Sequence, residues 1–167
     1  MIETERRFLV SPEWALILLV SKEGKVGIVQ TQGYIAADDT RTIRVRMENG
    51  MDSFLTLKGK KDENGSGLEI EGPIPNHLAD QLLTCGLCLG VVTKVRYILL
   101  GHAHMKVTLD VFTGENRGLV ILEVEGDEKT VKDFTIPSYV TREVTNDHRY
   151  SCSQLAQKPY STWEVRD

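Results

Sequence analysis

Acidic residues stand at alternate positions in two short stretches of the 167-residue chain. Glu3 and Glu5 form one pair, and Glu123 and Glu125 form another. Residues two apart on an extended strand lie about 7 Å from each other on one face, so each pair offers two carboxylates side by side. Asp110 is a fifth candidate. Carboxylate oxygens without histidine or cysteine suit Mg²⁺ or Mn²⁺, and Mg²⁺ usually bridges to the phosphates of a substrate.

Basic residues repeat with the same spacing. Arg44 and Arg46 form one pair, Lys94 and Arg96 form another, and Lys58 stands in a further alternating stretch. Guanidinium forks and ammonium groups complement phosphate oxygens. A divalent ion beside a basic cradle is typical of phosphoryl transfer, in which catalysis is mostly positioning and neutralisation of charge.

An antiparallel sheet or barrel is the arrangement predicted to position these side chains. Apolar and polar residues alternate between short turn signals, of which Asn49-Gly50 and Asn64-Gly65 are the strongest hairpin indicators. Eight strands are expected, at residues 2–10, 27–35, 41–48, 52–59, 67–73, 91–100, 104–112 and 118–125. Three helices are expected, one beginning at Ser11-Pro12, one over 76–83 and one over 147–157.

One face of nearly every predicted strand is charged and the other is apolar. The charged faces carry seven acids and seven bases: Glu3, Glu5, Glu69, Glu71, Asp110, Glu123, Glu125, Arg7, Arg44, Arg46, Lys58, Lys94, Arg96 and Lys106. A solvated face is the ordinary explanation of such a pattern. The balance of opposite charges favours a barrel whose charged face lines a lumen. The predicted fold is therefore mostly β (α+β), a closed eight-stranded antiparallel β tunnel covered by a few helices.

The composition of the chain argues against several classes of protein, namely nucleic-acid-binding, membrane-spanning and exported proteins. The net charge of −4 argues against a nucleic-acid-binding coat, so no nucleic acid is expected as a partner. The longest apolar run, residues 14–20, is too short to span a membrane, and the first seven residues lack the apolar stretch of a signal peptide. Three cysteines without an export signal indicate a reducing compartment. A cytoplasmic chain forming a single domain over residues 1–167 is expected.

The alternating motifs, taken in order, resemble a known family, the CYTH superfamily of triphosphate tunnel metalloenzymes. The stretch Glu3-Thr4-Glu5-Arg6-Arg7 is similar to its opening E-x-E-x-K signature, and the match extends to about residue 156. The remaining matching motifs are Thr42–Arg46, Phe54–Lys58, Glu69–Glu71, Thr93–Tyr97, Leu109–Phe112, Leu122–Glu125 and Glu143–Tyr150. The resemblance implies an eight-stranded β tunnel that hydrolyses or rearranges triphosphates with Mg²⁺ or Mn²⁺.

Roles for single residues follow from the resemblance. It implies metal ligands at Glu3, Glu5, Asp110, Glu123 and Glu125. It implies substrate-binding residues at Arg7, Arg44, Arg46, Lys58, Lys94, Arg96 and Arg149. It implies catalytic roles for Lys94, which would orient water, and for Glu5 and Arg7. The stretch 147–155 is similar to a C-terminal helix that plugs one end of the tunnel.

The sequence departs from the signature at Arg7, where the family has lysine. Arginine keeps the positive charge and can still bind phosphate, but it does not readily release a proton.

Taken over all the matching motifs, the resemblance implies a metal-dependent triphosphatase that acts on inorganic triphosphate, with nucleoside triphosphates as further substrates. It implies a monomer or a homodimer. A class IV adenylyl cyclase and a non-catalytic polyphosphate-binding or nucleotide-binding module are the alternatives.

Cys85 and Cys88 form a C-x-x-C motif, whose spacing fits zinc or a redox pair. The third cysteine, Cys152, lies far along the chain, and no second C-x-x-C is present. A zinc site of this kind needs four ligands, so the motif is interpreted as a pair of partly buried thiols near a helix end.

Overall fold

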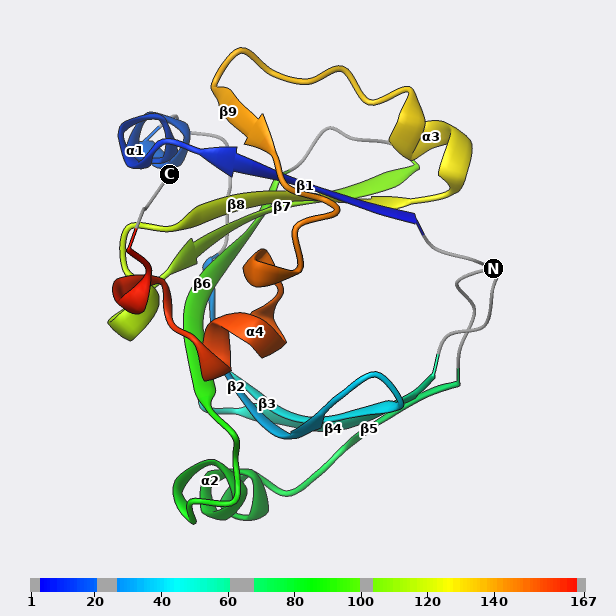
Figure 1. Cartoon of the computed structure of the whole chain (residues 1–167), viewed down its shortest axis with the longest axis vertical. Coiled ribbons are helices and arrows are strands. Elements are labelled where there is room, and N and C mark those ends of the chain that lie inside the picture. The colour runs from blue at the N-terminus through cyan, green and yellow to red at the C-terminus, as the bar shows by residue number, and fades with distance from the viewer. Residues whose placement is uncertain (1–3, 21–26, 61–67, 100–103, 165–167) are drawn as a thin grey trace.

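Nine antiparallel strands form one strongly curved sheet in the computed structural model of the chain, which describes residues 4–20, 27–60, 68–99 and 104–164. The strands are β1 (Thr4–Val10), β2 (Gly27–Ala37), β3 (Arg41–Glu48), β4 (Asp52–Gly59), β5 (Glu69–Pro73), β6 (Val91–Leu99), β7 (Met105–Phe112), β8 (Val120–Gly126) and β9 (Val140–Glu143). Their order across the sheet is β5-β4-β3-β2-β6-β7-β8-β1-β9. Figure 1 shows β1, β7, β8 and β9 on one side of helix α4, β2 to β5 on the other, and β6 joining the two sides.

Four short α-helices accompany the sheet: α1 (Pro12–Val20), α2 (Asn76–Thr84), α3 (Glu128–Lys132) and α4 (Cys152–Gln157). Three 3-10 turns lie at η1 (Gly114–Asn116), η2 (His148–Tyr150) and η3 (Tyr160–Thr162). Helices α1, α2 and α3 lie outside the curve of the sheet, whereas α4 lies within it (Figure 1). The described residues contain no helix long and apolar enough to cross a membrane.

Two apolar cores lie on opposite faces of the β1–β8–β7 region. Phe8 and Leu122 belong to the outer core, which α1 and α3 cover with Ala15 and Val131. Neighbouring residues on the same strands, such as Leu9, belong to an inner core. Because successive side chains on a strand point to opposite faces, one strand serves both cores. The inner core packs against Leu155 and Tyr150 of the C-terminal segment and closes one part of the concave side.

The predicted mostly β antiparallel tunnel fold is confirmed, with nine strands in place of eight. All eight predicted strands are present within a few residues of their expected ends, although residues 2–3, 67 and 100 lie outside the described ones. The ninth strand, β9, was not predicted, because it has four residues and pairs with β1, which is far away in the sequence. Within the described residues, no hydrogen-bonded ladder joins β5 to β9.

Turn residues explain two of the boundaries. Asn49 and Gly50 both have positive φ, 50° and 67°, which is the backbone of a tight hairpin turn between β3 and β4. The other predicted hairpin signal, Asn64-Gly65, lies outside the described residues. The helix predicted over 147–157 is divided into η2 and α4. Ser151 divides it because its extended backbone and its hydroxyl, which accepts from the Gln154 amide, cap the start of α4.

Candidate active site

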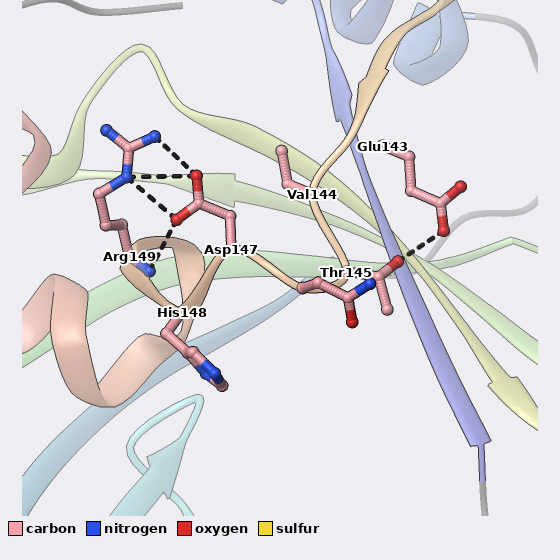
Figure 2. A pocket seen from close by; sticks show the side chains of 7 residues that line it. Glu143, Val144, Thr145, Asp147, His148 and Arg149 are labelled. Carbon is pink, nitrogen blue, oxygen red and sulfur yellow. Dashed lines mark hydrogen bonds and ion pairs between the residues drawn. The ribbon is translucent and has the colours of Figure 1, made fainter.

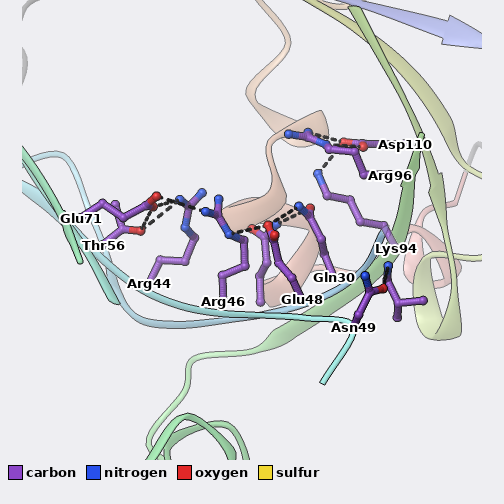
Figure 3. Close-up of polar contacts among 12 residues, drawn as sticks. Gln30, Arg44, Arg46, Glu48, Asn49, Thr56, Glu71, Lys94, Arg96 and Asp110 are labelled. Atoms are coloured by element: carbon purple, nitrogen blue, oxygen red, sulfur yellow. Dashed lines mark hydrogen bonds and ion pairs between the residues drawn. The ribbon is translucent and has the colours of Figure 1, made fainter. Parts of the chain in front are cut away.

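The concave face of β3, β4 and β5 carries a cluster in which two arginines share one carboxylate (Figure 3). Arg44 Nη2 lies 3.0 Å from Glu71 Oε2, and Arg46 Nη2 lies 3.1 Å from Glu71 Oε1. Thr56 donates to the same carboxylate at 2.5 Å. The register pairs Arg44 with Thr56 and Thr56 with Glu71, so alternation on three neighbouring strands brings these side chains together. Burial raises the pKa of Glu71, but the hydrogen bond from Thr56 and the charges of Arg46 and Arg44 outweigh it and hold that pKa below its usual range.

Both arginines retain unused binding capacity. Their side chains are 17% and 18% exposed, and the Nε atoms of Arg44 and Arg46 are buried without a hydrogen-bond acceptor. Arg46 Nε lies 3.1 Å from Glu48 Oε1, which is close enough for an ion pair but outside hydrogen-bonding geometry. A buried donor without an acceptor is costly, so these atoms are suited to an incoming anion.

A second cluster spans β6, β7 and β8. Lys94 is 2% exposed, Asp110 is fully buried, and the two form an ion pair. Arg96 makes a bidentate contact with Asp110, in which Nε donates to Oδ1 at 2.7 Å and Nη2 donates to Oδ2 at 2.6 Å. Arg96 also forms an ion pair with Glu123. Arg96 lies two strands from Glu123, so this contact passes over the intervening strand β7. Burial of these charged groups contradicts the ordinary solvated-face explanation and supports a lumen.

The electrostatics of this cluster follow from burial and pairing. Burial raises the pKa of the Asp110 carboxyl, but Lys94 and Arg96 outweigh it and hold that pKa below the ordinary value. Burial lowers the pKa of Lys94, but Cys152 and Asp110 outweigh it, so the lysine pKa is raised. Asp110 is therefore an anion between two cations.

Glu5, Arg7, Glu123 and Glu125 form a third cluster across β1 and β8. The register places Glu5 opposite Glu125 and Arg7 opposite Glu123. Arg7 Nε lies 3.0 Å from Glu5 Oε1, and Arg7 Nη2 donates to the Thr145 carbonyl at 3.2 Å. Arg7 stands at the position where the family signature has lysine. Its guanidinium contacts two different groups there, the Glu5 carboxylate and the Thr145 carbonyl.

The oxygen atoms of the carboxylates on β1, β7 and β8 are chemically suited to bind a hard divalent ion. Burial raises the pKa of Glu123, and so do the nearby carboxylates of Asp110 and Glu5. All the donors are oxygens, the ligands preferred by Mg²⁺ and Mn²⁺. In the described part of the chain, no three acidic, histidine or cysteine side chains are already arranged around one point. Glu5, Glu123 and Glu125 are the described candidates, while Asp110 has both oxygens bound by cations.

Two of the remaining predicted site residues, Lys58 and Arg149, form ion pairs of their own. Lys58 pairs with Glu69 at 3.0 Å, and both side chains are about half exposed, at 42% and 50%. Arg149 pairs with Asp147 at 2.6 Å and lies over the Trp163 ring, with 59% of its side chain exposed. Glu3 lies outside the described residues.

A pocket of about 610 Å³ follows the segment from Glu143 to Arg149, which leads from β9 into η2 (Figure 2). Arg149 and Asp147 face each other at one end of it, and the Thr145 hydroxyl donates to Glu143 at 2.7 Å at the other. Thr145 also accepts from the Arg7 amide at 3.1 Å. The pocket therefore adjoins the β1 side of the lumen rather than the Arg44–Arg46 cluster.

Sequence reasoning missed a row of polar side chains on β2. Tyr34 donates to Gln32, and Gln32 donates to Gln30, each at 3.2 Å. Gln30 in turn donates to Glu48 at 2.9 Å. Gln30, Gln32 and Tyr34 alternate along the strand, so the period-two pattern that revealed the charged residues would also have identified them. Cys152 was missed as well; its Sγ lies 3.6 Å from Lys94 Nζ.

Known sequences match most of the chain. A family model described as the CYTH domain matches residues 1–142. An inorganic triphosphatase from Acetivibrio thermocellus is 36% identical over 163 residues, which is 97% of each chain.

Two solved structures share the fold. The crystal structure of an inorganic triphosphatase superposes with a TM-score of 0.67 at 28% identity, covering 94% of this chain and 95% of that one. A putative adenylyl cyclase from Hippeastrum with a dominant triphosphatase activity superposes with a TM-score of 0.61, covering 78% of this chain and 83% of that one. At 17% identity, this second likeness concerns the fold alone. The family model and the relative from Acetivibrio thermocellus, which covers nearly the full length, show that the chain belongs to the CYTH domain family.

Proposed function

We propose that this protein hydrolyses inorganic triphosphate in the presence of a divalent metal ion. The observation that carries the proposal is the set of buried guanidinium Nε donors of Arg7, Arg44 and Arg46, which have no hydrogen-bond acceptor. They lie on the concave face of the sheet, beside carboxylates that suit a hard cation. The relative from Acetivibrio thermocellus, named an inorganic triphosphatase, supports the same reaction.

Arg44 and Arg46 bind the phosphate chain from one side of the lumen in this proposal, and Arg7 and Arg96 bind it from the other. Each guanidinium offers a planar fork that matches phosphate oxygens. Glu71 now occupies the forks of Arg44 and Arg46, so a phosphate group must share or displace this carboxylate. Lys58 stands at the more exposed end of the same strands and provides a further positive charge.

Glu5, Glu123 and Glu125 would hold the divalent ion, together with Glu3 and with Asp110 if its cations release it. When bound, such an ion neutralises phosphate charge and makes a coordinated water more acidic. Choice of Mg²⁺ or Mn²⁺ follows from the all-oxygen donor set. The other catalytic roles, orienting the water and neutralising the developing charge, are carried out by side chains of the protein.

Lys94 is proposed to orient the attacking water. Its ammonium has three donors, of which Asp110 accepts one and Cys152 Sγ, at 3.6 Å, accepts another, so one is left for water. Water attacks the terminal phosphorus, the bond from that phosphorus to the bridging oxygen breaks, and phosphate and diphosphate leave. Arg96 and the other cations neutralise the charge that develops on the departing oxygen.

The test is product analysis with purified protein, Mg²⁺ or Mn²⁺, and inorganic triphosphate or ATP in parallel. Phosphate released fastest from inorganic triphosphate is the expected result. We expect Glu123→Gln to lower kcat/KM by about 100-fold or more, because a preorganised charge is lost from the site. Glu128→Gln, on the exposed face of α3, is the matched control and should retain full activity.

Other outcomes would overturn the proposal. Cyclic AMP and diphosphate formed from ATP, with no phosphate from inorganic triphosphate, would establish a cyclase instead. Tight binding of triphosphate without any product would establish a binding module. Full metal-dependent activity in a Glu123→Gln, Glu125→Gln double variant would remove β8 from the metal site.

A further inference from the structure

Cys85 and Cys88 lie together at the end of helix α2, on the outside of the sheet. Cys85 follows the last residue of α2, with its amide donating to the Gln81 carbonyl, and is exposed. Cys88 is half-buried against β2: an ideal Cβ placed on Gly33 would lie 2.6 Å from Cys88 Sγ. Neither thiol belongs to the lumen clusters.

The two sulfur atoms are near neighbours. Cys85 Sγ and Cys88 Sγ both contact the same acceptor, the Leu82 carbonyl oxygen, each at 3.4 Å. Their separation is therefore at most twice that distance, and rotation about the side-chain bonds can reduce it. Gly86, between them, has a φ of 79°, a left-handed conformation that turns the chain back on itself. This turn keeps the two cysteines in one short loop at the end of α2.

The surroundings give the two thiols different roles. Cys85 is exposed and can be reached by a dissolved reagent. Burial raises the pKa of the Cys88 thiol, and the neighbouring Cys85 adds to this effect. Cys88 is thereby the less reactive of the two toward an external reagent and is placed to react with Cys85 once that residue is modified.

We propose that Cys85 and Cys88 form a reversible intramolecular disulfide by exchange with low-molecular-weight disulfides such as oxidised glutathione. The Cys85 thiolate attacks one sulfur of the reagent, forms a mixed disulfide and releases one glutathione thiolate. Cys88, after losing its proton, attacks Cys85 Sγ and releases the second glutathione. The protein loses two protons and two electrons, which together are two hydrogen atoms, and one oxidised glutathione becomes two reduced molecules.

The position at the C-terminal end of α2 favours a disulfide that persists. The negative end of the helix dipole lies near these sulfurs, so it does not stabilise a thiolate as a helix N-terminus does. Strongly oxidising C-x-x-C pairs are those whose reduced form is stabilised, and that stabilisation is missing here. A zinc site is disfavoured because the described residues contain no third histidine, cysteine or acidic ligand grouped with the pair.

The disulfide would tie the end of α2 to the segment that pairs with β2 and continues into β6. The Leu89 amide, directly after Cys88, donates to the Tyr34 carbonyl at 2.8 Å, and the Tyr34 amide donates to the Gly90 carbonyl at 3.2 Å. A covalent bond at Cys85 and Cys88 therefore fixes the start of this paired segment.

The experiment equilibrates the full chain with buffers of varied reduced-to-oxidised glutathione ratio, quenches it with acid and measures intact and peptide masses. We expect a species lacking two hydrogens, with the link mapped to Cys85 and Cys88 and reversed by dithiothreitol. Cys88→Ser should trap the glutathione adduct on Cys85. Cys85→Ser should show at least about tenfold less adduct than Cys88→Ser, since the remaining thiol of the motif is half-buried.

Cys152→Ser is the matched control for disulfide formation and should form the Cys85–Cys88 link to the same extent as the unaltered chain, because Cys152 lies beside Lys94 in the lumen, away from the motif. The proposal is overturned if no ratio yields the linked species in the unaltered chain. It is also overturned if the link involves Cys152, or if the adduct on Cys85 persists without closing onto Cys88. Circular dichroism of each variant confirms that the fold is retained.

Discussion

Asp110 is the residue on which the buried charges of the lumen depend. It is fully buried, and both of its oxygens accept from Lys94 or Arg96. A buried charge is tolerated only when it is paired, since removal of one partner leaves the other uncompensated. The cluster carries two cations and the two acids Asp110 and Glu123, so each carboxylate is needed to balance it.

We expect Asp110→Asn to lower the free energy of unfolding by about 3–5 kcal/mol, because Lys94 and Arg96 would lose a buried counter-ion without a change in volume. Urea unfolding at neutral pH measures the loss. Asp80→Asn on the exposed side of α2 is the control and should change stability by less than about 0.5 kcal/mol. Equal stability of both variants would show that the lumen charges are hydrated rather than paired.

At the scale of elements, the C-terminal helix α4 is fixed by a close approach to the residue before β6. An ideal Cβ on Gly90 would lie 1.9 Å from the Ala156 carbonyl oxygen, and backbone atoms at this contact have no side-chain freedom with which to move aside. Leu155, in the same helix turn, is fully buried in the inner core. Gly90 therefore determines how deeply α4 lies within the curved sheet.

Gly90→Ala should displace α4 and destabilise the protein by at least about 1–3 kcal/mol, the usual cost of overpacking. Thermal unfolding followed by circular dichroism measures the effect. Gly72→Ala is the matched control: no atom lies within 4 Å of an ideal Cβ there. If both variants unfold at the same temperature, α4 is not packed against this segment in solution.

In the molecule as a whole, the acidic and basic side chains of the lumen form ion pairs with one another. Some arginine N–H groups still have no hydrogen-bond acceptor and can bind an anion. Arg44 and Arg46 share Glu71, Arg7 approaches Glu5, and the Nε atoms of all three arginines lack a hydrogen-bond acceptor. A polyanion that binds the folded lumen and not the unfolded chain must raise the stability of the fold. Binding and folding are thus linked through the same side chains.

Inorganic triphosphate, added with a chelator to prevent metal-dependent turnover, should raise the melting temperature. At a concentration of 100 times Kd, the expected stabilisation is about 2.7 kcal/mol. An Arg44→Gln, Arg46→Gln double variant should lose most of this rise, whereas Lys132→Gln on α3 should keep it. Chloride at matched ionic strength separates specific binding from screening. A rise that is unaffected by the double variant would place the anion elsewhere.

Alternation along the chain predicted eight of the nine strands and which of their faces is charged. A period of two puts Arg44 and Arg46 on one face and Glu123 and Glu125 on one face, whatever the neighbouring strands are. The apolar partners of these residues on the other face predicted that the sheet is covered by helices. Even the division of the last helix has a local cause, the Ser151 cap.

Which acid meets which base depends on the tertiary structure. The pairing of Arg96 with Glu123 depends on the order β6-β7-β8, and that of Arg6 with Glu143 at 2.8 Å joins residues 137 positions apart in β1 and β9. Burial of Lys94 likewise depends on the curvature of the sheet and on α4, because alternation cannot distinguish a face turned to solvent from one turned inward. Strand pattern is local, whereas charge pairing and burial depend on contacts between residues far apart in the chain.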